Sequence, residues 1–389
     1  MNLPDPRIKV ALLTNTIAPA RIPIYTGLAA QFDLLVLHGG PEKNRDSWHA
    51  IEKQLTNAKV KKAWGWVIRL AKRENGRILD YQYIHIRPGY AWHLLLFRPE
   101  AVITNEMGLR TLTALVYGTL FRKPIWVWCG STLHSERNIG PARRLLRVVI
   151  AKWARQWISY GQTTTEYLLS LGIERDDILQ IQNAVDERRF SRGTTATFEI
   201  QPRPVLLHVG QFIPRKGIDL LLRAAATLEK EGREFSLLLV GSGPDKASLR
   251  QLSEELQLKN VYFEHSQVPE KMQSVYRSGD VLIFPTLEDV WGLVANEAML
   301  AGLPVLCSKY AGCAPELFPP ANIFDPRNPH EFTTKLREAV AGALPKPDLS
   351  RLKTTPQIVN SMVSAIENSA RRESGLPQTA SDEKPSGHS

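Results

Sequence analysis

Short apolar runs and longer periodic segments alternate along this chain, and the alternation predicts its secondary structure. Short runs bounded by turn residues are typical of buried strands, whereas apolar residues that recur every three or four positions are typical of helices. Strands are predicted at residues 9–13, 33–37, 101–104, 124–128, 157–159, 178–181, 205–209, 236–240, 261–263 and 280–284. Helices are predicted at residues 24–31, 108–120, 218–229, 245–256 and 269–277. This order predicts an α/β protein whose parallel sheets carry helices on both faces.

Residues 191–203 interrupt the alternation, because they are polar and show no clear periodicity. We predict a linker there. It would separate an N-terminal domain of residues 1–190 from a C-terminal domain of residues 204–352. A terminal helix is predicted within residues 353–370, and the polar tail of residues 371–389 is predicted to be disordered.

The composition is that of a globular protein with room for two domains of ordinary size. The chain has 389 residues, of which 43% are hydrophobic. No apolar run reaches the roughly 18 residues that a transmembrane helix needs, and the first residues lack the shape of a signal peptide. The three cysteines show no metal-binding spacing. Because sparse cysteines fit a reducing compartment, we expect a cytoplasmic protein.

The net charge of +10 arises in the first half of the chain. Residues 1–192 carry 28 Lys and Arg against 16 Asp and Glu. Two basic segments, 61–73 and 142–157, also contain Trp and aliphatic residues. If helical, each either touches an anionic membrane surface or packs on the core with a solvated cationic face. No nucleic-acid-binding motif accompanies them, so nucleic acid is not an expected partner.

The stretch from residue 285 to residue 304 carries the most informative acidic residues. Glu288 and Asp289 follow an apolar strand, and Gly292 provides a tight turn before a helical segment that contains Glu297. If the helix starts near Val290, eight residues span at most about 12 Å and rotate about 80°. That separation suits one extended polar ligand that is touched at two points.

A second candidate site lies in residues 208–217, where a strand ends and a helix is predicted to begin. Gly210 opens the loop, and the cations Arg215 and Lys216 precede the helix. Loop amides, the helix N-terminus and the cations together would hold a diphosphate, whereas the simpler alternative is a solvated Arg–Lys pair. Gly241 and Gly243 follow another strand, but a lone Gly-x-Gly is more often only a turn.

Together these motifs resemble those of the retaining glycosyltransferases of family 4. The family signature is an acidic residue, seven others and then Glu-Ala-Met-Ala-x-Gly-x-Pro-Val. Here Asp289 is followed by seven residues, Glu297 and AMLAGLPVL. The stretch 261–269 resembles the segment that passes the base. The resemblance implies the GT-B fold, in which two Rossmann-like parallel-sheet domains face a cleft and a terminal helix returns to the first domain.

The resemblance also implies a donor site for a nucleotide-diphosphate sugar. Lys216 and Arg215 would neutralise the leaving diphosphate, and Glu297 would bind the ribose. Either Glu288 or Asp289 would hold the sugar hydroxyls. Other donor-binding positions implied by the motifs are Gly210, Gln211, Gly241, Gly243, Val268, Trp291, Gly292 and Leu293. Gln211 departs from the family, which usually has Arg there, and no Asp-x-Asp motif accompanies these residues, so no metal or other cofactor is expected.

The acceptor is implied to bind the first domain, and two residues there are candidates. His134 is implied to lie near the transferred sugar, the alternative being a structural or surface histidine. Arg21 is placed on the acceptor side, the alternative being a surface arginine. Its loop lacks the Gly-Gly pair of many family members and resembles a subgroup with Pro-x-Arg-x-Pro.

The resulting interpretation is a hexosyltransferase of polysaccharide or glycolipid biosynthesis, peripheral at the cytoplasmic face of a membrane. Its expected partners are a nucleotide sugar, a glycan or lipid-linked acceptor, and an anionic membrane surface. Two alternatives remain open. One is a non-catalytic protein that keeps the glycosyltransferase fold and assists another enzyme. The other is a nucleotide-sugar epimerase or hydrolase.

Overall fold

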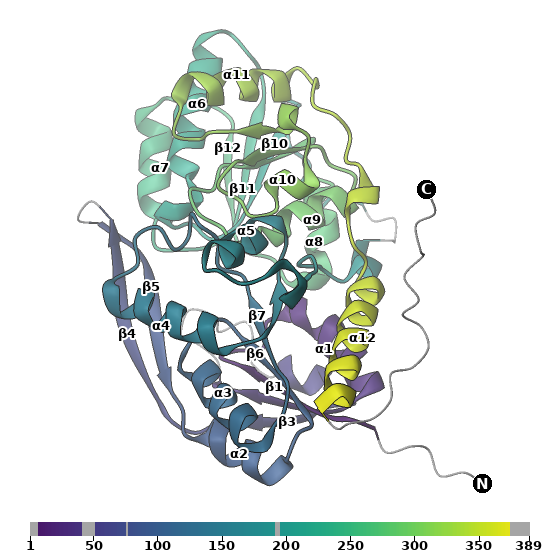
Figure 1. The fold of residues 1–389 in the computed structure, drawn as a ribbon. Helices are drawn as coiled ribbons and strands as arrows, with labels where there is room; N and C mark the ends of the chain where they lie inside the picture. Colours follow the sequence, from purple (N-terminus) through teal and green to yellow (C-terminus); the bar gives the residue numbers. More distant parts are fainter. Residues whose placement is uncertain (1–6, 41–50, 75–76, 191–194, 374–389) are drawn as a thin grey trace, which may run out of the picture.

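The computed structural model describes residues 7–40, 51–74, 77–190 and 195–373, which form two α/β domains joined end to end (Figure 1). The predicted strands are confirmed, and their ends differ from the prediction by one residue at most. Most of their apolar runs are buried because helices cover both faces of each sheet, and the edge strand β12 (Val261–Glu264) is an exception. No helix within these ranges is both long and apolar enough to cross a membrane.

The first domain is built on a seven-stranded parallel sheet in the order β3-β2-β1-β6-β7-β8-β9. The strands are β1 (Lys9–Thr14), β2 (Asp33–His38), β3 (Lys59–Lys62), β6 (Ala101–Asn105), β7 (Ile125–Cys129), β8 (Gln156–Ser159) and β9 (Ile178–Gln180). The helices are α1 (Ile22–Gln31), α2 (Gly89–Phe97), α3 (Leu109–Phe121), α4 (Pro141–Trp153) and α5 (Gln162–Ser170). Alternate residues of β1 point to opposite faces, so Val10 packs with α1 while Ala11 packs with α2, α3, α4 and α5.

The second domain repeats this plan with a six-stranded parallel sheet in the order β12-β11-β10-β13-β14-β15. The strands are β10 (Val205–Val209), β11 (Ser236–Val240), β12 (Val261–Glu264), β13 (Val281–Phe284), β14 (Val305–Ser308) and β15 (Ile323–Phe324). The helices are α6 (Ile218–Lys230), α7 (Lys246–Glu255), α8 (Met272–Tyr276), α9 (Leu293–Leu300), α10 (Ala314–Leu317) and α11 (Pro329–Val340). The predicted helix 269–277 is divided into the 3-10 turn η7 (Pro269–Lys271) and α8.

The last helix, α12 (Thr355–Glu373), lies along α1 of the first domain (Figure 1). The Trp126 indole donates a hydrogen bond to Ser369 Oγ at 3.0 Å. The predicted start of a disordered tail at residue 371 is wrong, because Arg371 and Arg372 belong to the helix. The rest of that tail, residues 374–389, and positions 191–194 of the predicted linker lie outside the described residues.

One basic segment is a strand and not a helix. Residues 61–73 run from the end of β3 into β4 (Trp66–Glu74), which pairs with β5 (Arg77–Ile86) as an antiparallel ribbon. The sequence signal for this hairpin is the dipeptide Asn75-Gly76 between two alternating runs, a pair that favours two-residue hairpin turns. The other basic segment does begin as a helix, α4, before it continues into β8.

Candidate active site

The carboxyl ends of the strands in the second sheet carry three loops that meet. These loops follow β10, β11 and β13, the edge at which open α/β sheets bind ligands. Gly241 and Gly243 permit the contact between the first two loops. A Cβ on Gly241 would collide with the carbonyl oxygen of Gly210, and one on Gly243 would collide with that of Phe212. The Gly-x-Gly motif is therefore needed for loop packing.

Lys216 and Asp289 form a nearly buried ion pair at this edge. Lys216 ends the 3-10 turn η6 (Pro214–Lys216), and its Nζ lies 2.6 Å from Asp289 Oδ2. Asp289 Oδ1 accepts a hydrogen bond from the Trp291 amide at 3.2 Å. Burial opposes ionisation of Asp289, but the charges of Lys216 and Arg215 outweigh it and hold the pKa of this carboxyl below its ordinary value. The pair is therefore charged at neutral pH.

Glu288, the neighbouring carboxylate, has a different partner. Its Oε2 lies 2.8 Å from Arg137 Nη1, which belongs to the first domain. The two adjacent acids, which sequence alone left equivalent, are thus separated by structure. Asp289 faces the lysine of the second domain, and Glu288 connects the two domains.

Arg215 lies beside the same loop. Its Nη1 donates to the carbonyl of Glu288 at 3.1 Å, and its own carbonyl accepts from the Leu287 amide at 2.7 Å. Gln211 is exposed, while the Arg215 charge lowers the pKa of Asp289. A second cation is therefore present at this edge, although it occupies a different position in the motif.

Glu297 is half-buried in α9, which begins at Leu293 and not near Val290 as predicted. Gly292 delays the start of the helix. It has a φ of 103°, and a Cβ there would collide with the Phe284 ring. Glu297 Oε2 accepts a hydrogen bond from the Tyr276 hydroxyl at 2.7 Å. Burial raises the pKa of Glu297 to about 7, although that hydrogen bond and Arg189 oppose the shift.

The Trp291 side chain helps to join the domains. It is buried, its Nε1 donates to Asn296 Oδ1 at 2.8 Å, and Asn296 Nδ2 donates to the carbonyl of Asn183 at 3.2 Å. The Trp291 amide is already bonded to Asp289. The first amides of α9, which start at Leu293, lack intrahelical acceptors by helix geometry.

His134 crosses from the first domain to the same loop. Its Nε2 lies 2.8 Å from the carbonyl oxygen of Leu287, and its ring stacks on Tyr310 with 4.5 Å between centroids. Burial lowers the pKa of His134, so the ring is neutral at pH 7 and donates to that carbonyl. The structure thus brings His134 next to Glu288 and Asp289, as the two carboxyl edges face each other.

Arg21 is buried at the carboxyl edge of the first sheet. Its guanidinium carbon lies 4.2 Å from the ring centre of Trp128 and 4.6 Å from that of Tyr160. Arg21 is 8% exposed, and its Nη1 has no hydrogen-bond partner within the described residues. The alternative of a surface arginine is wrong, because Arg21 packs between aromatic rings.

Sequence reasoning missed three residues of this region: Arg137, Tyr276 and Tyr310. Each contacts a predicted site residue from a distant position, and none lies in a recognisable motif. Gly210 and Val268 lie where predicted, after β10 and β12, but the Val268 side chain is 54% exposed. Among the residues that the structure describes, no three His, Cys, Asp or Glu side chains gather in a way that would hold a metal ion.

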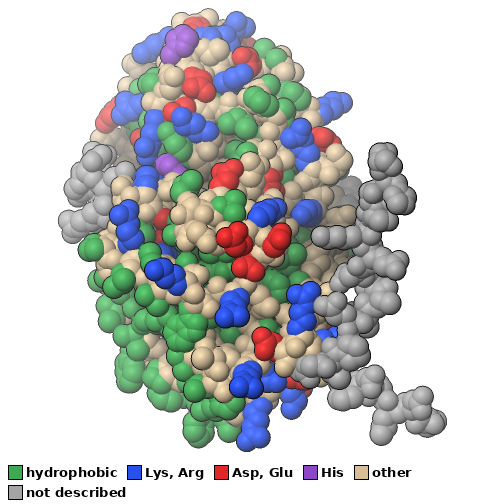
Figure 2. Space-filling view, in the orientation of Figure 1, with side chains coloured by type: hydrophobic (Ala, Val, Ile, Leu, Met, Phe, Trp, Pro, Cys, Tyr) green, Lys and Arg blue, Asp and Glu red, His purple; other side chains and the backbone are tan. Residues whose placement is uncertain are grey.

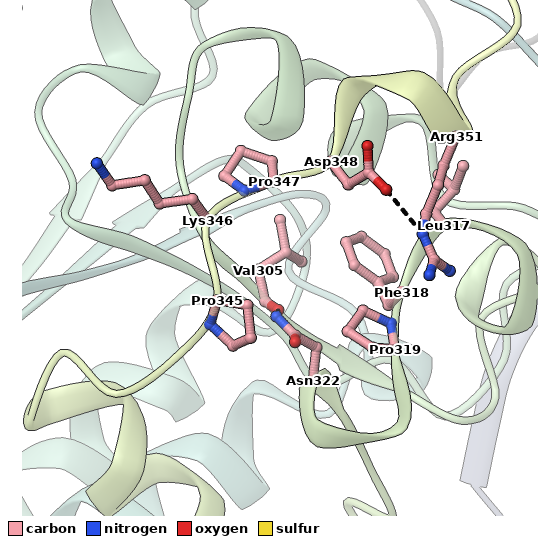
Figure 3. A pocket seen from close by; sticks show the side chains of 10 residues that line it. All are labelled: Val305, Leu317, Phe318, Pro319, Asn322, Pro345, Lys346, Pro347, Asp348 and Arg351. Atoms are coloured by element: carbon pink, nitrogen blue, oxygen red, sulfur yellow. Dashed lines mark hydrogen bonds and ion pairs between the residues drawn. The ribbon is translucent and has the colours of Figure 1, made fainter.

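A small pocket of about 190 Å³ lies elsewhere in the second domain (Figure 3). Val305, the first residue of β14, lines it. The pocket is therefore at the amino edge of the sheet, opposite to Lys216 and Asp289. Figure 3 shows Phe318 and Pro319 on one side of it and Pro345 on the other. It is not part of the candidate active site.

Comparison with known proteins concerns the second domain and the overall fold. Residues 196–352 match the family model described as glycosyl transferases group 1. The match covers the second domain. The D-inositol 3-phosphate glycosyltransferase of Nocardia farcinica is 31% identical over 178 residues, which are 42% of this chain and 39% of that protein. The sulfoquinovosyl transferase of Arabidopsis thaliana is 30% identical over 267 residues, 62% of this chain and 50% of that protein. The chain thus spans two fifths to a half of these curated relatives.

Solved structures resemble both domains of the chain at once. Anabaena HepE in complex with UDP-glucose has a TM-score of 0.63 at 17% identity and covers 95% of this chain and 98% of its own. The lipopolysaccharide outer core galactosyltransferase WaaB, in its apo form, has a TM-score of 0.63 at 15% identity with the same coverage. At these identities the likeness concerns the fold, and it confirms the predicted GT-B architecture of two Rossmann-like domains.

Proposed function

We propose that this protein is a retaining glycosyltransferase that moves a sugar from a nucleotide-diphosphate sugar to an acceptor. The observation that carries this proposal is the partly buried Lys216–Asp289 pair, with Arg215 beside it, at the carboxyl edge of the second sheet. A charged group held in a water-poor site stabilises developing charge without reorganising at the moment of reaction.

The two cations act on the leaving group. When the glycosidic bond to the donor breaks, negative charge accumulates on the departing nucleoside diphosphate. Lys216 stabilises that charge, and Arg215 supplies the second positive charge in place of Gln211. Because Lys216 is already bound to Asp289, its ammonium is oriented before the donor arrives.

The carboxylates bind different parts of the donor. Asp289 orients Lys216 and accepts a hydrogen bond from a hydroxyl of the transferred sugar. Glu297 accepts hydrogen bonds from the ribose hydroxyls. Glu288 binds Arg137 and so acts on the sugar only indirectly, through the position of the first domain. Gly292 and Leu293 complete the sugar site with the first amides of α9.

Solved structures of the same fold support a uridine nucleotide as the donor. Anabaena HepE was solved with UDP and with UDP-glucose. Curated relatives are described as glycosyltransferases of D-inositol 3-phosphate and of 2-deoxystreptamine. We propose a UDP-sugar donor on this basis, with no metal required.

The acceptor binds the first domain in this proposal. His134 lies at the carbonyl of Leu287, next to the donor loop. Arg21 Nη1, which has no hydrogen-bond partner in the part of the chain that the structure describes, offers a buried donor at the facing edge. We propose a glycan or lipid-linked glycan as the acceptor, used in polysaccharide or glycolipid synthesis on the cytoplasmic side of a membrane.

Thermal stabilisation by nucleotides tests the donor site. The full chain is heated with UDP, ADP, GDP and their sugar conjugates in the presence of EDTA. One base and its sugar diphosphate should raise the unfolding midpoint. Lys216→Ala should lose the shift, whereas Lys230→Ala, at the exposed end of α6, should keep it.

Two other results would change the proposal. No shift with any nucleotide, from a folded sample, would contradict the donor site. A shift without turnover in any acceptor mixture would favour the non-catalytic partner, for which the neutral residue Gln211 is the supporting observation.

A further inference from the structure

One face of the ribbon of β4 and β5 is apolar and exposed at the end that holds Trp66 and Ile86, whereas further along it Leu70 pairs with Gln82 and Lys72 with Asp80. Paired residues of an antiparallel ribbon lie on the same side, and alternate residues of a strand share a face. The pairs Trp66–Ile86 and Ile68–Ile84 therefore lie together with Leu70. These five side chains are between 38% and 65% exposed. The described chain does not cover this face.

The exposed apolar surface continues on neighbouring helices. α3 is a neighbour of α2, of α4 and of β5, so the four elements form one continuous region. Its exposed large side chains include Trp92 and Leu96 on α2, Leu120 and Phe121 on α3, and Leu145 and Trp153 on α4. Figure 2 shows apolar side chains gathered over this part of the molecule, at the lower left. We name this region, with the ribbon face, the ribbon surface.

The charges on the helices of the ribbon surface are of one sign, whereas the ribbon also contains Glu74 and Asp80. α2, α3 and α4 contain no Asp or Glu. Lys61, Lys62 and Arg69 are exposed on and beside the ribbon, and Arg144 and Lys152 are exposed on α4. A partner that covers this surface must be apolar at its centre and negatively charged around it.

We propose that the ribbon surface docks on the interface of an anionic lipid bilayer. Trp side chains suit the headgroup level, aliphatic side chains enter the acyl boundary, and Lys and Arg attract anionic headgroups. A second copy of this chain is a poorer occupant, because pairing the surface with itself would oppose cations to cations. The proposal goes beyond sugar transfer and does not depend on it, since docking requires no donor or acceptor.

The ribbon also connects this surface with the second domain. β5 is a neighbour of η6, the turn that carries Arg215 and Lys216. A bilayer on the ribbon surface would therefore lie near the loop that we assign to the donor diphosphate. This placement, which rests on the proposed function, would bring a lipid-linked acceptor close to the donor.

Sedimentation with vesicles tests the docking. The full chain is mixed with vesicles of phosphatidylcholine alone, or with about one third phosphatidylglycerol, at low and at high salt. The anionic vesicles should bind at least about tenfold more tightly, and salt should weaken the binding without abolishing it, because part of the attraction is apolar.

Two double variants separate the contributions. Trp66→Glu with Ile68→Glu should lower vesicle binding at least about tenfold by removing apolar area from the ribbon. Lys61→Glu with Lys62→Glu should lower binding to anionic vesicles alone. The matched control is Leu349→Glu, which changes a side chain of the second domain that is 51% exposed and should leave binding unchanged.

Each variant is checked for an unaltered unfolding midpoint and an unaltered size in solution. Equal binding of the Trp66→Glu, Ile68→Glu variant would overturn the proposal, and so would a folded protein that binds neither vesicle. A dimer that this variant converts to a monomer, with no vesicle binding, would assign the surface to a second copy instead. A stabilising nucleotide shift in any of these samples shows that the donor site is intact, so the two proposals fail separately.

Discussion

The two domains share an architecture but differ in where their distinctive chemistry lies. The first domain contributes all of the net positive charge, and the ribbon and α2 to α4 carry most of the exposed large apolar side chains of the described residues. The second has only three exposed large apolar side chains among its described residues, Tyr262, Val268 and Leu349. Its candidate site residues Lys216 and Asp289, whose side chains are 12% and 18% exposed, lie with Glu297 at the carboxyl edge of the sheet. A shared fold therefore does not imply a shared role, because loops and surfaces are set independently of the sheet.

The domains meet through contacts that tie the first to the candidate site of the second. His134 and Arg137 reach the loop of Leu287 and Glu288. The carboxylate of Glu316 bonds to the Gln162 amide, at the start of α5. A negative group at a helix N-terminus is favourable, because it neutralises the first free amides. Movement of the first domain would therefore displace the loop of Leu287 and Glu288 in the second.

The largest effect is expected from Lys216→Ala, which removes the principal cation of the second domain. Turnover should fall about 100-fold or more, the loss seen when one preorganised group at a transition state is removed. It is measured as kcat/KM with the donor identified by thermal shift. Lys230→Ala is the control, and near-normal turnover of Lys216→Ala would refute the site.

Substitutions of the two adjacent acids should lower turnover to different extents. Asp289→Asn should lower turnover about tenfold to thirtyfold, or about 1.4 to 2 kcal/mol, because the Lys216 ammonium loses its partner. Glu288→Gln should lower turnover less than about threefold, since its partner Arg137 lies in the first domain. The same kinetic assay serves both variants, and the reverse order would exchange their roles.

Loop packing in the second domain should be sensitive to a single methyl group. Gly241→Ala should destabilise the protein by about 1 to 3 kcal/mol, because the new Cβ collides with the backbone of Gly210. Chemical denaturation measures the loss. Gly140→Ala is the matched control, since a Cβ at Gly140 meets nothing within 4 Å; equal stability of the two variants would contradict the loop contact.

The pH dependence of nucleotide binding should report on Glu297. Burial raises the pKa of Glu297 to about 7. A protonated carboxyl has one oxygen that donates, so it cannot accept hydrogen bonds from both ribose hydroxyls with its two oxygens. The Kd should therefore rise about tenfold as the pH falls from about 8 to about 6, because the proton competes with the ligand. Tyr276→Phe removes a hydrogen bond that lowers this pKa, so the midpoint should move to higher pH. Titration calorimetry measures both, and Glu297→Gln should flatten the profile.

The smallest effect is expected at the ion pair between the domains. A double-mutant cycle of Arg137→Ala and Glu288→Gln should give a coupling of about 0.5 to 1 kcal/mol in unfolding free energy, because the pair is only partly buried. Arg337→Ala, whose partner Glu231 is more exposed, provides the comparison. A coupling of several kcal/mol would mean that the domains are held together mainly by this pair.

Much of the fold was predictable because most of its strands are buried on both faces and so stand out as apolar runs. The ribbon was missed because β4 mixes basic and apolar residues, a pattern that also suits an amphipathic helix. The Asn75-Gly76 dipeptide was the signal that would have identified it. The start of α9 was placed too early, because the helix begins only after Gly292 and its positive φ.

The sequence by itself determined the two α/β domains and brought Lys216, Asp289 and Glu297 into one candidate site, because motifs at strand ends gather at one sheet edge. Only the tertiary structure decided which acid meets which cation. Lys216 and Asp289 are 73 positions apart, and Arg137 and Glu288 are 151 apart. The burial that raises the pKa of Glu297 and the exposure of the ribbon face were likewise set by tertiary packing. Such properties depend on what surrounds a side chain in space, and a local pattern of residues does not contain that information.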